Sequence, residues 1–153
     1  MSKKPTTADA QLILQLYDLR REPEMRKARN WVLTEFWPRN ADDYVKTVMA
    51  MGTQENAWLR QVSSYWNMAA SFALSGALNS ELFLQPAVSG EMFFLFAKVH
   101  PFLKELREKM GEPKSFSVIE KLIASSKDSR NRLNSTLKRV RALKEKRAGA
   151  SAR

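Results

Sequence analysis

The sequence predicts an all-α fold, a single-domain irregular bundle of about six or seven helices with a kinked central helix. Apolar residues recur at helical spacings of three and four along most of the 153 residues, and no stretch alternates between apolar and polar as a strand would. Proline and glycine divide this pattern into segments of helix length. A chain of this length can bury a core without disulfides, which this cysteine-free chain could not form.

Prolines separate the first three predicted helices. The first begins near Thr7, and the second begins at Pro23, because proline suits the first helical position and disfavours helical geometry in the residue before it. The second helix runs towards Trp37, where Pro38 ends it. Asn40 is placed to cap the third helix.

Two longer helices, residues 53–76 and 91–110, are expected to form the central pair, with a short helix over 80–84 between them. In the second, apolar residues follow one another at steps of four, three, four, three and four. This register continues across Pro101 and predicts one continuous helix, bent near Ala97, whose carbonyl loses its hydrogen-bond donor. We expect six residues of the pair to be core positions: Trp58, Val62, Phe72, Phe96, Val99 and Leu103.

Capping and terminating residues also mark the ends of the helices that follow. Gly111 closes the second central helix. Ser117 and Glu120 have the spacing of a capping box for the next helix. The last helix is expected to begin near Ser126 and to fade at Gly149.

The positive charge collects at the C-terminal end. The net charge is +10, and residues 127–153 alone hold ten basic and two acidic residues. We therefore divide the chain into a helical core domain, 1–126, and a basic C-terminal helix and tail, 127–153. Mutual repulsion predicts a last helix that is docked through about Val140 and mobile afterwards. Six of its cations are candidates for contact with a polyanion: Lys138, Arg139, Arg141, Lys144, Lys146 and Arg147.

These six cations spread round most of a helical wheel, which suits nonspecific attraction to phosphates or to an anionic membrane surface. No aromatic residue follows Phe116 that could stack on a base, so recognition of base sequence is not expected. The alternative is a solvated last helix that contributes only solubility.

Residue types that carry catalysis or bind metals are scarce. The chain has one histidine, His100, and no cysteine, so neither a nucleophile–histidine pair of the usual kind nor a thiolate site is expected. Asp42 and Asp43 point in different directions on a helix, and compensation of the helix dipole explains them. We find no glycine-rich phosphate loop and no metal-ligand spacing, and we expect no enzyme activity, cofactor or metal.

Three aromatic residues could line a cleft for a small ligand. Trp58 and Trp66 lie eight residues apart, close to two helical turns, and Tyr65 lies beside them. The same residues could equally be core, because large aromatic side chains dominate core burial. Both interpretations stay open at this stage.

No membrane-spanning or secretory segment is expected. Residues 61–80 are uncharged, but they hold too many polar side chains for a lone helix in lipid. Lys3 and Lys4 resemble the start of a signal peptide, but Pro5 and Asp9 follow where an apolar run should begin. We expect a cytoplasmic protein.

Three segments at the start of the chain resemble the opening of a family of uncharacterised bacterial all-helical proteins: LYDLRR at 16–21, MRKAR at 25–29 and FWP at 36–38. Leu103, Arg107, Gly111 and Pro113 fit the same pattern, so the resemblance covers most of residues 10–125. It implies an all-helical domain of unknown function and supplies no catalytic residues. The basic C-terminus lies outside it.

The leading functional hypothesis is a non-enzymatic interaction module that docks a protein partner or a second copy of itself through its helical body. The Met- and Phe-rich helix over 91–110 could supply the apolar surface. One alternative is binding of nucleic acid or of an anionic surface through residues 127–147. Another is binding of a small ligand at Trp58, Tyr65 and Trp66.

Overall fold

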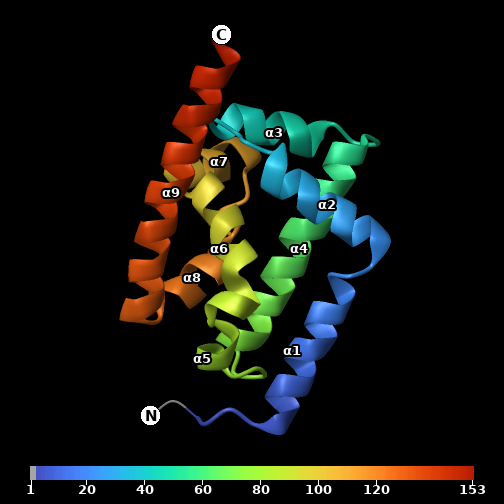
Figure 1. The fold of residues 1–153 in the computed structure, drawn as a ribbon, viewed down its shortest axis with the longest axis vertical. Helices are drawn as coiled ribbons and strands as arrows, with labels where there is room; N and C mark the ends of the chain where they lie inside the picture. Colours follow the sequence, from blue (N-terminus) through green and yellow to red (C-terminus); the bar gives the residue numbers. More distant parts are fainter. Residues whose placement is uncertain (1–2) are drawn as a thin grey trace.

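A computed structural model describes residues 3–153 and confirms an all-α, bundle-like fold (Figure 1). The described residues form nine α-helical segments and one 3-10 turn, more segments than the six or seven helices expected. In chain order they are α1 (Thr7–Leu19), α2 (Pro23–Thr34), α3 (Ala41–Met49), α4 (Gln54–Leu74), α5 (Ser80–Phe83), α6 (Pro86–Val99), the 3-10 turn (His100–Phe102), α7 (Leu103–Met110), α8 (Ser117–Ala124) and α9 (Lys127–Ser151).

Most helix starts are set by local capping. The side chains of Asn40, Thr53 and Ser126 each accept a hydrogen bond from a backbone N–H three residues ahead, so α3, α4 and α9 begin where the sequence predicts. The cap of α1 is Thr6, one residue before the expected position, in a capping box with Asp9.

The capping box expected for α8 is wrong. The N-cap residue is Phe116, whose φ of 57° lies in the left-handed region and whose side chain is buried in the core. The carboxylate of Glu120 instead accepts a hydrogen bond from the Arg107 guanidinium at 2.6 Å. Burial of the phenyl ring therefore fixes the turn before α8, and Ser117 becomes its first helical residue.

The central helix is kinked, but it is not one α-helix bent at Ala97, and that expectation is wrong. It begins at Pro86, and the α-helical pattern stops at Val99, where the 3-10 turn containing Pro101 changes the direction of the chain before α7 (Figure 1). Proline has no N–H to donate, so the helix loses its regular bond at this point. The Lys144 ammonium of α9 donates a hydrogen bond to the Lys98 carbonyl at 3.1 Å, close to the break.

The core lies between α4, α6 and the helices packed around them. Val62, Phe96, Val99 and Leu103 are buried as expected, whereas Trp58 and Phe72 are only partly buried at the margin of the core. Nine residues of α6 are buried, including its methionine and two of its three phenylalanines. The helix over 91–110 therefore builds the core, and the expectation that it supplies a docking surface is wrong.

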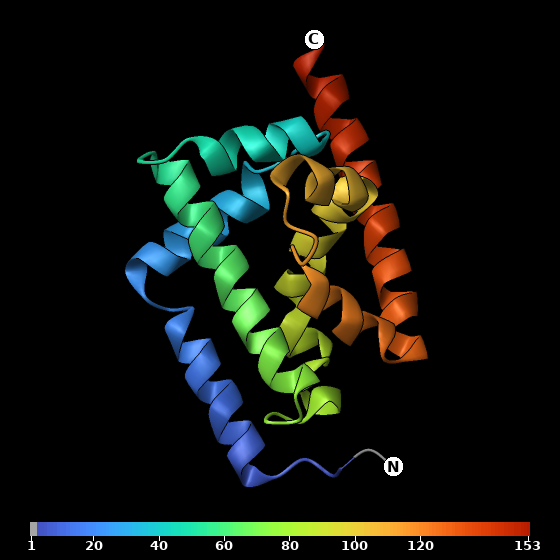
Figure 2. The ribbon, with the colours of Figure 1, turned by 180° about the vertical axis from the view of Figure 1, so that it is seen from behind.

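Helices α1 and α9 lie at opposite edges of the molecule, as both views show (Figures 1 and 2). On α1, Leu16 is the single buried residue, and its carbonyl accepts a hydrogen bond from the Tyr65 hydroxyl at 2.6 Å. On α9, contacts continue past Val140 to Lys144 and to Arg147, so docking extends farther along the helix than expected. No helix within residues 3–153 has the length and apolar character that crossing a membrane requires.

Candidate functional site

The outward face of α9 carries most of the candidate polyanion contacts. Lys138, Arg139, Arg141, Lys146 and Arg147 are exposed. Within the described residues one ion pair involves them, between Arg141 and Glu145 at 3.4 Å on the surface. Such an exposed pair contributes little stability, and the five cations together with Glu145 still carry a net charge of +4. The structure thus brings five cations to the surface of one rigid helix.

The apolar side of α9 faces the body of the protein. Val140 is buried and Leu133 is packed against the core, so these side chains hold α9 to the bundle. Leu143 is the one large apolar side chain of α9 that is exposed, with 37% of its surface accessible. The outward face is therefore cationic, with almost no apolar surface of its own.

Lys144, the sixth candidate, points inward and caps a helix end. Its ammonium bonds the Lys98 carbonyl at the C-terminal end of α6 and lies 5.7 Å from the centre of the Phe102 ring. Carbonyls at a helix C-terminus attract cations. Lys144 thus joins α9 to α6, and burial lowers its pKa.

Lys98 also caps a helix end, at a more deeply buried position than Lys144. Its side chain is fully buried, and its ammonium donates hydrogen bonds to the carbonyls of Val32 (2.6 Å) and Phe36 (2.8 Å) at the C-terminal end of α2. The Trp37 ring lies 3.7 Å from the ammonium, and the Arg147 guanidinium is also near this ring, at 5.3 Å. The two lysines therefore link α2, α6 and α9 in series through helix ends.

Among residues 3–153, the charged groups that act on the pKa of Lys98 are both cations. Burial lowers the pKa of Lys98 to about 7, and the nearby charges of Lys144 and Arg147 act in the same direction. The carbonyls and the aromatic ring stabilise the ammonium while it is charged. Lys98 is thus a buried group that gains or loses its proton near neutral pH.

A second buried charge cluster surrounds Glu91. Its carboxylate contacts the guanidinium groups of Arg29 at 2.9 Å and Arg20 at 3.6 Å, and it accepts a hydrogen bond from the Trp66 indole at 3.1 Å. The Nε of Arg20 has no hydrogen-bond partner within the described residues. The cluster joins the C-terminal end of α1 to α2, α4 and α6.

The aromatic residues proposed for a ligand cleft do not meet at an open surface. Trp66 is 1% exposed and packs in the core, with the Tyr65 ring 4.9 Å away. Trp58 instead packs 6.1 Å from Trp31 at the margin of the core. Trp66 and Tyr65 are packing residues whose polar atoms are hydrogen-bonded, to Glu91 and to the Leu16 carbonyl. Tyr65 also borders the surface hollow beside Leu19 and Met68, which neither tryptophan lines.

The catalytic residue types are also dispersed. His100 is exposed, its ring lies against Phe96, and its side chain has no hydrogen bond or ion pair within residues 3–153. Asp42 pairs with Lys109 at 2.8 Å, and Asp43 pairs with Arg39 at 2.9 Å. No group of three or more metal-binding side chains among the described residues could hold an ion.

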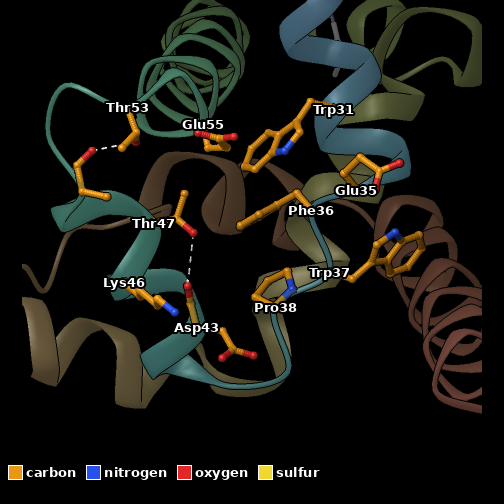
Figure 3. Close-up of a pocket in the computed structure, with 11 residues that line it drawn as sticks. Trp31, Glu35, Phe36, Trp37, Pro38, Asp43, Lys46, Thr47, Thr53 and Glu55 are labelled. Atoms are coloured by element: carbon orange, nitrogen blue, oxygen red, sulfur yellow. Dashed lines mark hydrogen bonds between the residues drawn. The ribbon is translucent and has the colours of Figure 1, made fainter. Parts of the chain in front are cut away.

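A surface pocket of about 390 Å³ lies between the end of α2, α3 and the start of α4 (Figure 3). Glu35, Glu55 and Lys46 place mixed charges around it, beside the indole of Trp31. Trp37 also borders the pocket, but its indole turns away towards α9 (Figure 3). Its mixed charge does not favour a phosphate group, and none of the sequence-predicted site residues lines it.

Sequence reasoning missed the buried charges of Lys98 and Glu91. A signal was available, because these residues are the only two charges in the otherwise apolar run EMFFLFAKV at 91–99. They lie seven residues apart, hence on one side of a helix that is apolar all round. Charges on such a helix have to be buried with partners.

The comparisons with known proteins show a family but no function. The family model described as "Domain of unknown function (DUF4760)" matches residues 5–126. No curated protein and no solved structure matches the chain.

Proposed function

We propose that this chain, which belongs to the family described as Domain of unknown function (DUF4760), is a non-enzymatic interaction module that binds the phosphate backbone of a nucleic acid through α9. The observation that supports the proposal is the group of exposed cations around the free sides of a docked helix, with a single exposed carboxylate pairing against them. The family match ends at residue 126, so the proposal rests on this chain's own C-terminal residues.

The dimensions and charge of α9 suit a polyanion. Its 25 residues span about 37 Å, roughly the length of one turn of duplex DNA. Each lysine or arginine that approaches a phosphate releases a condensed counterion, which favours binding without any base contact. The proposed binding is therefore insensitive to sequence and steeply dependent on salt.

An anionic membrane is the less favoured partner. A helix that lies in a membrane surface turns an apolar face into the lipid. The apolar side chains of α9, among them Val140, face the bundle and are not available for insertion. Binding to the phosphates of a nucleic acid requires only the exposed cations of α9, without an apolar face.

The test compares two double variants of equal charge. Arg139→Gln together with Lys146→Gln removes two outward cations of α9, whereas Arg21→Gln together with Arg26→Gln removes two exposed cations at the junction of α1 and α2. We expect the unmodified protein to bind a random-sequence DNA duplex with an affinity that falls linearly with salt on logarithmic axes. The α9 variant should reduce that slope by about 2, and the junction variant should leave it unchanged.

Three results would contradict the proposal. The first is equal weakening by both double variants, which would indicate net charge alone. The second is binding that does not change with salt. The third is binding to vesicles that contain phosphatidylserine, without binding to the duplex, which would favour a membrane surface.

A further inference from the structure

Helix α4 has one long face that no other element within residues 3–153 covers. It runs along the side of the molecule shown in Figure 2, and no helix crosses in front of it. The exposed or part-exposed positions on this face follow one another at steps of four, three, four, three and four: Ala57, Gln61, Ser64, Met68, Ser71 and Ser75. This is the spacing of the contact positions of a two-stranded coiled coil.

The chemistry of this face is also that of a contact surface. From Gln61 to Ser80 the chain carries no charged residue, although its net charge is +10. Met68 at its centre is 40% exposed. A solvated helix face normally carries charged or polar residues; this one is polar and uncharged, with an exposed methionine at its centre, on a protein of net charge +10.

The two sides of the ridge formed by Gln61 and Ser64 differ. On one side lies a shallow hollow of about 440 Å³, lined by apolar side chains that include Leu19 and Met68 and bordered by Glu22. On the other side the surface belongs to α4 alone and carries Arg60. The face therefore combines a ridge, one flanking hollow and opposite charges on its two sides.

We infer that a second copy of this chain docks on this face, with α4 parallel to its counterpart and a two-fold axis along the pair. A two-fold axis in this direction exchanges the two sides of the ridge, so Arg60 of each copy lies opposite Glu22 of the other. An axis perpendicular to α4 would not create this pairing. Charge complementarity thus selects both the partner and the orientation.

The remaining charge distribution favours the same arrangement. Helix α9, which carries the exposed cations, lies at the edge opposite α1 (Figures 1 and 2). Two copies that meet through α4 keep these cations far apart, which limits the repulsion between two chains of +10. The inference does not depend on nucleic-acid binding, since α4 and α9 are separate surfaces.

Disulfide crosslinking tests the geometry, because the natural chain has no cysteine. Ser64→Cys places a thiol on the ridge, near the two-fold axis, where the two chains approach most closely. Ser135→Cys, at an exposed position of α9, is the matched control. We expect mild oxidation to convert Ser64→Cys to a covalent dimer many times faster than Ser135→Cys.

Sedimentation equilibrium tests the association itself. The unmodified protein should form a dimer, and Met68→Glu should shift it to monomer, because it places a carboxylate of each copy at the contact. Met68→Leu, which keeps the apolar volume, should retain the dimer, and equal thermal melting of the two variants would show that both are folded. Equal crosslinking at positions 64 and 135, a monomer at all concentrations, or a dimer that survives Met68→Glu would each overturn the inference.

Discussion

Replacing Glu91 with alanine is expected to lower the free energy of unfolding by about 3–5 kcal/mol, because removal of one partner leaves buried charges uncompensated. The carboxylate is the shared partner of Arg20 and Arg29, and the exposed fractions of the two arginine side chains are 12% and 23%. Its loss also removes the acceptor of the buried Trp66 N–H. Urea unfolding followed by tryptophan fluorescence measures the change.

Two further variants separate charge from hydrogen bonding at this position. Glu91→Gln keeps an acceptor for Trp66 but removes the negative charge, so we expect a loss smaller than that of alanine. Glu145→Ala breaks the exposed pair with Arg141 and should cost less than about 0.5 kcal/mol. If Glu91→Ala proved as mild as Glu145→Ala, the cluster would not stabilise the junction of α1 with the core.

Stability is expected to rise with pH above about 7 because of Lys98. Its pKa in the folded protein is about 7, below the value of 10.5 for an unperturbed lysine. Between these two values the unfolded chain binds more protons than the folded one, so raising the pH favours folding. The slope contributed by this one group is at most about 1.4 kcal/mol per pH unit.

Lys98→Met isolates this contribution. The variant cannot titrate at position 98, so the stability of the unmodified protein relative to the variant should grow by about 2 kcal/mol between pH 7 and pH 9. Measurements stop below pH 10, because burial raises the pKa of Tyr65 to about 12 and tyrosine ionisation then favours unfolding. Parallel stability curves for the two proteins would show that the ammonium keeps its proton throughout this range.

Local hydrogen bonding explains which helix boundaries could be predicted. The caps at Asn40, Thr53 and Ser126 each bond a backbone group three residues away, so the relevant atoms lie within one short segment of sequence. Ser117 has the same local pattern, but burial of the Phe116 ring against distant helices prevails. The break at Pro101 also involves a distant partner, since Lys144 comes from a different helix.

The candidate site likewise has features that the sequence predicts and features that depend on tertiary packing. The number of cations in α9 could be predicted from the sequence alone, but their directions depend on which side of α9 packs against α6. Lys144 therefore proved to be a helix cap, while Arg139 and Lys146 lie on the surface. The charged contacts of Glu91 join residues more than 60 positions apart in the sequence. Local sequence patterns therefore do not indicate which residues pair with Glu91.

The attachment of α1 determines how the native protein opens. Leu16 is its one buried residue, Leu12 and Ile13 pack partly buried against the core, and polar contacts hold its ends, such as the hydrogen bond from the Asn79 N–H to Asp9. Helices with little buried apolar surface unfold in sub-global steps, at a free energy below that of global unfolding. The amides of α1 should therefore exchange with deuterium as one cooperative unit, ahead of those of α4. In that partly open state the hydroxyl of Tyr65 loses its acceptor, the Leu16 carbonyl, and becomes accessible to water.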